Sequence, residues 1–167
     1  MSASPDTRLA DAIALRENGQ LQLALPLLLA LRAEFPADAR IAVQTAWVHD
    51  SLGLEQEAVA HYEAALAGEL GDDERRSALL GLGSTLRALG RDADSDRVLR
   101  EGIARFPDFK PLRVFHALTA YNLGRPRDAI EQLIGLLLES TDDPTILRYR
   151  RSLSAYARDL DRSWLTP

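Results

Sequence analysis

A glycine recurs at nearly even intervals along the 167-residue chain, and each one ends a stretch of helical periodicity. The four glycines are Gly19, Gly53, Gly90 and Gly124, at intervals of 34, 37 and 34 residues. Glycine can close the last turn of a helix in a left-handed conformation that other residues avoid. A repeated interval of this size predicts a repeat architecture, in which similar small units stack on one another.

Two further landmarks recur in register with the glycines. Phe35-Pro36 and Phe106-Pro107 lie 16 to 17 residues after the first and third glycines, and a proline there stops a helix. Small residues occupy the fifth position after every glycine, namely Ala24, Ala58, Ser95 and Ala129. Four small residues at one register predict that two helices approach closely at this point of each unit.

These landmarks resemble the tetratricopeptide repeat family, whose unit is a helix–turn–helix of 34 residues. Leu82-Gly83 matches the Leu-Gly pair of the family's first helix, whereas Leu70 and Thr141 stand where the closing proline is expected. The resemblance implies an all-α fold, a right-handed α-solenoid of four units plus a C-terminal capping helix, with nine helices in total. The predicted units are 5–38, 39–72, 76–109 and 110–143, flanked by a disordered stretch at 1–4 and by the capping helix and tail at 144–167.

Three local features refine this expectation. The acidic stretch Asp72-Asp73-Glu74 is most simply a solvated turn between the second and third units. Pro26 would interrupt a helix that starts near Gln20, so we expect that helix to start near Gln22 or to bend at Pro26. The tail is expected to form one helix from Pro144 to Leu165. It should shield the apolar side of the preceding helix around Leu133 and Leu137.

In the family, the first helices of successive units line a concave groove. The resemblance therefore implies a groove lined by residues at positions 5, 9 and 12, counted from the start of each unit. These residues are Leu9, Ile13, Val43, Trp47, Asp50, Leu80, Ser84, Arg87, Val114, Leu118 and Tyr121. The Lys and Asn with which chaperone-binding members hold a peptide carboxylate are absent at positions 5 and 9. A mainly apolar groove is expected instead, with Trp47 and Tyr121 as anchors and Asp50 and Arg87 at the rim.

Two alternatives about this groove stay open at the level of sequence. Trp47 fits either a ligand anchor or a core residue packed between first helices, and the C-terminal helix could itself fill part of the groove. Two functions follow. The groove could bind an apolar or helical segment of another protein, or it could be buried by self-association in a homodimer.

The sequence favours no enzyme, since it shows no acid–base pair, nucleophile system or ligand cluster, and we predict no catalytic residue, metal or cofactor. The three histidines have no metal-site spacing, and His49 and His116 are expected to be core residues. A net charge of −5 argues against nucleic-acid binding, and cysteine is absent. The longest apolar run, 23–31, is too short to span a bilayer, and 1–6 does not resemble a signal peptide, so no membrane association and a cytoplasmic location are expected.

Overall fold

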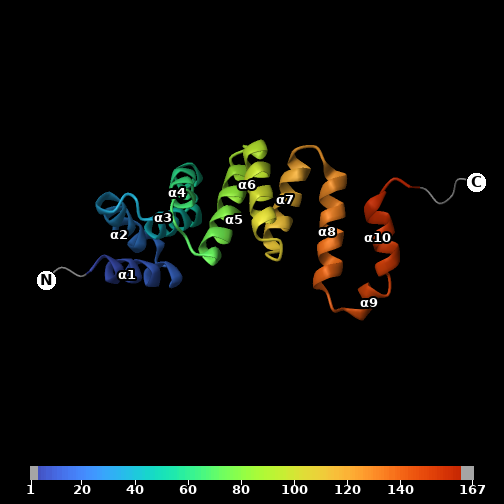
Figure 1. Ribbon diagram of the computed structural model, residues 1–167, viewed down its shortest axis with the longest axis horizontal. Helices are drawn as coiled ribbons and strands as arrows, with labels where there is room; N and C mark the ends of the chain where they lie inside the picture. Colours follow the sequence, from blue (N-terminus) through green and yellow to red (C-terminus); the bar gives the residue numbers. More distant parts are fainter. Residues whose placement is uncertain (1–3, 163–167) are drawn as a thin grey trace, which may run out of the picture.

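The computed structural model describes residues 4–162. Over this range the chain is helical and contains no strand, and the helices follow one another along an elongated stack, with α1 at one end and α10 at the other (Figure 1). The helices are α1 (Pro5–Glu17), α2 (Leu21–Glu34), α3 (Ala39–Ser51), α4 (Glu55–Ala67), α5 (Asp72–Ala88), α6 (Asp92–Arg105), α7 (Pro111–Asn122), α8 (Pro126–Ser140), α9 (Pro144–Leu147) and α10 (Arg150–Arg158). The predicted all-α solenoid of four helix pairs is confirmed.

The repeated glycines end the first helix of every pair. Gly19, Gly53, Gly90 and Gly124 have φ angles of 74°, 73°, 72° and 72°, and within 4–162 no other residue type has a positive φ. An L-residue with a side chain would be strained at each of these turns. The glycines recur because each of these turns requires a left-handed backbone conformation. For that reason the repeat could be recognised in the sequence.

The boundary between the second and third units differs from the prediction. Asp72-Asp73-Glu74 is the first turn of α5 and not a loop, so the three extra residues of the third unit lengthen its first helix. Three carboxylates at a helix N-terminus interact favourably with the positive end of the helix dipole, which explains why this acidic stretch is helical. The start of the second helix was also uncertain because of Pro26. Helix α2 begins at Leu21 and continues through Pro26 to Glu34.

The ends of the chain also differ from the prediction. Ser4, expected to be disordered with 1–3, caps α1 by accepting a hydrogen bond from the backbone N–H of Thr7, while 1–3 lie outside the described residues. The single terminal helix expected from Pro144 to Leu165 is two helices, α9 and α10, so the described chain has ten helices and not nine. Arg150 bonds to the carbonyl oxygen of Leu138 at 2.8 Å and so holds the start of α10 beside α8. Residues 163–165 of that expected helix lie outside the described part.

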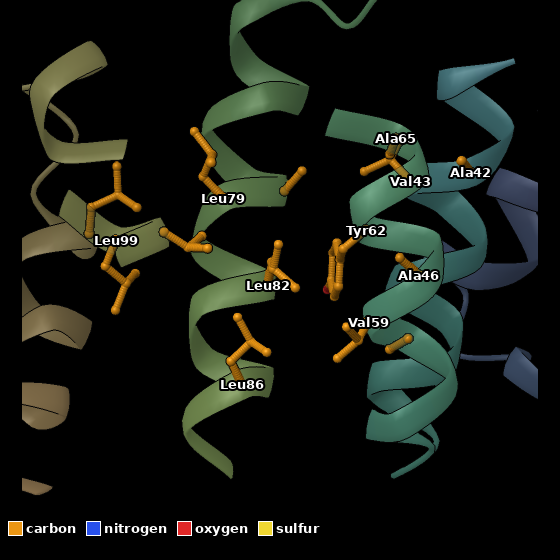
Figure 2. Packing of buried hydrophobic residues seen from close by; sticks show 14 residues of the cluster. Ala42, Val43, Ala46, Val59, Tyr62, Ala65, Leu79, Leu82, Leu86 and Leu99 are labelled. Carbon is orange, nitrogen blue, oxygen red and sulfur yellow. The ribbon is translucent and has the colours of Figure 1, made fainter. Parts of the chain in front are cut away.

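The core runs through the stack because each helix packs on its pair partner and each second helix on the first helix of the next pair. Figure 2 shows its centre, where Tyr62 of α4 points toward Leu82 of α5. Close approach within each pair is made possible by the small residues at the fifth position after the glycine, all of them buried: Ala24, Ala58, Ser95 and Ala129. In the third unit the Ser95 hydroxyl donates to the carbonyl oxygen of Gly83 at 2.7 Å, so the two helices of that pair meet at the predicted register.

Ala129→Leu is expected to lower the free energy of unfolding by about 1–3 kcal/mol, because Ala129 is buried between α7 and α8 and extra volume there overpacks the contact. Urea denaturation followed by circular dichroism measures the change. The matched control is Ala33→Leu on the exposed side of α2, which should stay within about 0.5 kcal/mol of the parent. Equal stability of the two variants would contradict the assigned contact.

Candidate protein-binding surface

The predicted groove residues occupy three repeating positions of the first helices, and the structure gives the fifth position a core role in two units. Leu9 and Val43 are buried in hydrophobic clusters that include residues of the following first helix, and Leu80 is half-buried against the core. The expectation that Leu9 and Val43 offer their side chains to a ligand is therefore wrong. Both side chains lie among residues of several helices, the next first helix included, and sequence spacing alone does not reveal this burial.

At the ninth position the side chains are partly open in the first three units. Ile13, Trp47 and Ser84 are half-buried. Trp47 packs against the central core cluster, and the guanidinium of Arg16 lies over its ring, 5.3 Å from the ring centroid. This cation–π contact links the twelfth position of the first unit to the ninth position of the second. The sequence allowed Trp47 to be either a core residue or a ligand anchor. In the structure its side chain packs against the core and remains partly exposed.

At the twelfth position, Asp50 is engaged within the protein. Its carboxylate accepts hydrogen bonds from the Tyr62 hydroxyl at 3.1 Å and from the Thr85 hydroxyl at 2.9 Å. Burial and the adjacent Asp50 charge both raise the pKa of Tyr62, which keeps the phenol protonated as a donor. Asp50 therefore ties the second unit to the third, and this use of its carboxylate was not visible in the sequence.

Arg87 occupies the twelfth position of the third unit. It is half-buried, its Nε is buried without a hydrogen-bond partner, and no ion pair to Arg87 is found in the described part of the chain. Arg87 holds the same repeat position as Arg16, and Leu118 the same as Trp47, so the Arg16–Trp47 contact predicts that Arg87 lies near Leu118 of the fourth unit. A partly desolvated guanidinium beside an apolar side chain is suited to a carboxylate that arrives together with apolar surface.

In the fourth unit, apolar side chains of both helices are exposed to solvent at repeat positions that are more buried in earlier units. Val114, Leu118 and Tyr121 of α7 are 36%, 38% and 67% exposed. On α8 three more apolar side chains are exposed on one face, Ile130, Leu133 and Leu137. We call these six residues the open end face. The α8 residues were not among the predicted site residues, although their helical spacing was recognisable.

The C-terminal helices leave this face free. Helix α10 packs on another side of α8, where Leu138 and Ala157 are buried and a pocket of about 310 Å³ remains between the helices. Figure 1 shows α10 beside α8, on the side away from α7. The expectation that the terminal helix shields Leu133 and Leu137 is wrong, because the contact is made by the outer face of α8. For the same reason, α10 does not occupy the groove beside α7.

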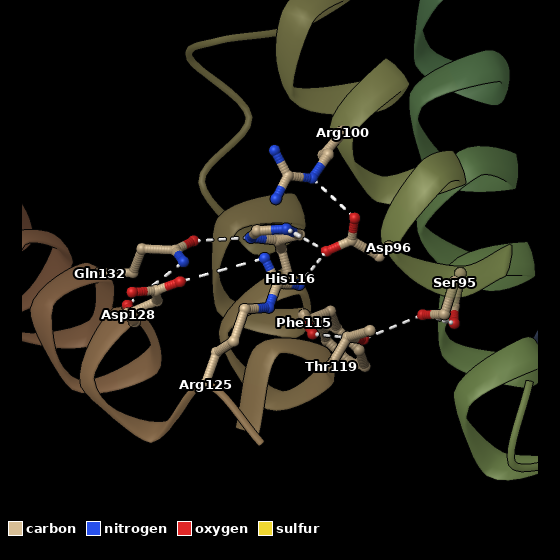
Figure 3. Close-up of polar contacts among 10 residues, drawn as sticks. Ser95, Asp96, Arg100, Phe115, His116, Thr119, Arg125, Asp128 and Gln132 are labelled. Carbon is tan, nitrogen blue, oxygen red and sulfur yellow. Dashed lines mark hydrogen bonds and ion pairs between the residues drawn. The ribbon is translucent and has the colours of Figure 1, made fainter. Parts of the chain in front are cut away.

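A partly buried polar cluster links the third and fourth units (Figure 3). Asp96 of α6 accepts hydrogen bonds from Arg100 at 2.7 Å and from Arg125, and a ring nitrogen of the buried His116 lies 3.0 Å from the same carboxylate. The other ring nitrogen of His116 lies 2.8 Å from Gln132 Oε1. Partial burial favours the neutral form of Asp96, but the two arginine hydrogen bonds outweigh it and lower its pKa.

The Asp96–His116 pair was missed in the sequence because its members are 20 residues apart on different helices. Both residues sit at positions that face the neighbouring unit, so the pair acts as an inter-unit contact. His49 is also buried, so the expected core placement of His49 and His116 is confirmed. Among residues 4–162, no group of three or more potential metal-ligating side chains comes together. No helix in that range has the length and apolar character needed to cross a membrane.

Comparison with known proteins agrees with this architecture. A family model described as tetratrico peptide repeat matches residues 39–160. Among solved structures, PilF of Pseudomonas aeruginosa is similar with a TM-score of 0.68 and 18% identity, over 92% of this chain and 69% of PilF. A MamA structure, from AMB-1, gives 0.69 and 19% over 86% and 78% of the two chains, and a MamA mutant gives 0.68 and 18% over 78% and 74%. No curated protein sequence matches significantly.

The chain belongs to the tetratricopeptide repeat family. Its fold is that of a protein–protein interaction module, and members of this family are typically non-catalytic scaffolds.

Proposed function

We propose that the chain binds an acidic, partly apolar helical segment of another protein along the exposed side of its first helices. The proposed contact region is formed by Trp47, Ser84, Arg87, Leu118 and Tyr121. The observation that carries the proposal is the buried, unpartnered Nε of Arg87 on α5, together with the exposed Leu118 and Tyr121 on the next first helix, α7. Aromatic and arginine side chains are the types that most often dominate the energy of protein interfaces.

The charge preference follows from the desolvation of Arg87. Its Nε is already removed from water without a hydrogen bond, so part of the cost of burying the guanidinium is present in the free protein. A partner carboxylate that bonds this group recovers that cost, whereas a partner lysine would be repelled. Tyr121 supplies apolar area and a hydroxyl at little cost in side-chain entropy.

The alternative, burial of this groove by self-association, has less support. Leu9 and Val43 are already buried within one chain, and the Asp50 carboxylate is engaged with Tyr62 and Thr85. Leu9 and Val43 are therefore not available to an interface that runs along the whole groove of two copies.

The proposal is tested with two fluorescent synthetic helices that carry leucines at i, i+4 and i+7, one with glutamates between them and one with lysines. Fluorescence anisotropy should show tighter binding of the glutamate peptide. Leu118→Ala/Tyr121→Ala should weaken binding about tenfold or more, and Arg87→Gln should remove the preference for glutamate. Arg97→Gln, at an exposed arginine of the second helix α6, is the matched control and should change neither property. Equal binding of both peptides, or equal affinity of all variants, would contradict the proposal.

A further inference from the structure

We infer that a second copy of the chain docks on the open end face, so that α7 and α8 of the two copies form a four-helix bundle. The face consists of Val114, Leu118, Tyr121, Ile130, Leu133 and Leu137. The inference goes beyond the proposed function, because half of this face belongs to α8, which is not part of the first-helix surface.

The α8 side of the open end face corresponds to a surface that is buried between units three times in the chain. Leu133 occupies the same repeat position as Leu28, Tyr62 and Leu99, which are 0%, 1% and 0% exposed, whereas Leu133 is 38% exposed. A side chain built on Gly81 of α5 would collide with Tyr62, which shows that the first helix of the next unit covers this position. The open end face is thus a stacking surface without its covering helix.

The described C-terminal helices, α9 and α10, do not cover the open end face. Leu137 and Ile130 are each 43% exposed although α10 packs along the same helix. Helix α10 instead contacts the side of α8 that carries Ile134 and Leu138. Apolar side chains gathered on one face in this way are uncommon on monomeric proteins and mark an interaction site.

A head-to-tail arrangement of two copies is disfavoured by the charge of Asp11. In the array, the seventh position of a first helix faces the preceding second helix, as the contact of His116 with Asp96 shows. The first helix of the first unit has Asp11 at that position. Continuing the stack with a second copy would place the Asp11 carboxylate against Ile130 and Leu133, where it would lose water without gaining a partner.

The spacing of the apolar residues on the open end face suits contact with a second copy of the same face. Val114, Leu118 and Tyr121 are spaced i, i+4, i+7, and the α8 residues Ile130, Leu133 and Leu137 are spaced i, i+3, i+7. An antiparallel helix pair with such a stripe on each helix is half of a four-helix bundle. None of the six residues is charged, so a two-fold arrangement buries no ion among them, and two-fold dimers are the commonest oligomers.

A consequence is competition between the two binding modes. Leu118 and Tyr121 belong both to the open end face and to the proposed peptide contact. A second copy and a bound segment would therefore exclude one another at these residues, and the peptide should shift the chain from dimer to monomer.

The experiment is sedimentation velocity of the full chain over a range of concentrations. The parent should dimerise, and Leu133→Glu/Leu137→Glu should raise the dimer dissociation constant at least about tenfold with unchanged helicity, since both side chains are exposed. Leu23→Glu/Leu27→Glu, which changes two exposed leucines of α2 at the other end, is the matched control and should still dimerise. Because the chain has no cysteine, Leu137→Cys and Leu23→Cys also give clean crosslinking probes, and only Leu137→Cys should form a covalent dimer on oxidation.

A parent chain that stays monomeric at every concentration would overturn the inference. So would a dimer that is lost in Leu23→Glu/Leu27→Glu but retained in Leu133→Glu/Leu137→Glu. If a chain ending at Arg162 dimerises and the full chain does not, residues 163–167 cover the face instead. The test is independent of the proposed function. The α8 variants leave Arg87 and Trp47 intact, so glutamate-peptide binding can persist when dimerisation fails, and the reverse holds for Arg87→Gln.

Discussion

Tyr62→Ala is expected to lower the free energy of unfolding by about 3–5 kcal/mol, the largest effect of any substitution considered for this chain. Tyr62 is 1% exposed and lies between α4 and α5, against Gly81. Truncation would leave a cavity at the junction of the second and third units, and the Asp50 carboxylate would lose one of its two hydrogen bonds. Urea denaturation followed by circular dichroism measures the loss.

Two related variants separate the causes of that loss. Tyr62→Phe keeps the ring and removes only the hydroxyl, so it should cost about 0.5–1.5 kcal/mol. Tyr121→Ala removes the same side chain from a position that is 67% exposed and should change stability by no more than about 0.5 kcal/mol. If Tyr62→Ala were no more destabilising than Tyr121→Ala, the ring of Tyr62 would not be part of the packed core.

Asp96→Asn is expected to have the second largest effect and to lower the free energy of unfolding by about 1.5–3 kcal/mol at neutral pH. The carboxylate accepts from Arg100 and Arg125 and faces His116, and hydrogen bonds to charged groups contribute about this much. The value is well below that of a fully buried pair because both arginines are partly exposed to solvent. The midpoint of urea denaturation at pH 7 measures it.

The same carboxylate predicts the pH dependence. The pKa of Asp96 is lower in the folded chain than its ordinary value of about 3.9, so the stabilisation is present above that value and is lost as the pH falls through the folded pKa. The parent should therefore lose its advantage over Asp96→Asn as the pH is lowered below about 4. Glu139→Gln, at an exposed carboxylate whose pKa is also lowered by Arg113, is the control and should show a smaller difference. A stability difference between parent and Asp96→Asn that does not change with pH would contradict the assignment.

The sequence predicted those features of the fold that depend on local conformation or on a repeated position. Gly53 and its three equivalents were visible because a left-handed turn admits few other residues, and Ala58 and its equivalents because close helix contact admits only small side chains. The family resemblance placed Trp47, Leu118 and Tyr121 on first helices correctly. Their degree of exposure was not predictable, because it depends on whether a following unit covers them.

The residues that the sequence misplaced all depend on contacts between distant segments. Val43 is buried in a cluster that includes residues of α4 and α5, and Asp50 is bound by Thr85, which lies 35 residues further along the chain. The docking of α10 on the outer face of α8 also depends on tertiary packing, in which Leu138 and not Leu133 becomes buried. A pattern of apolar residues marks the faces of a helix that can be covered, but it does not specify which neighbour covers each face.

The central claim, that this repeat module binds an acidic helical segment on its first-helix surface, is tested most directly by nuclear magnetic resonance of the isotope-labelled chain during titration with the glutamate–leucine peptide. The account predicts that the largest shifts of backbone amide signals occur at Arg87, Leu118 and Tyr121 and that Arg87→Gln reduces them. Shifts confined to second-helix residues such as Arg97 and Glu101, with Arg87 and Leu118 unchanged at saturation, would contradict it.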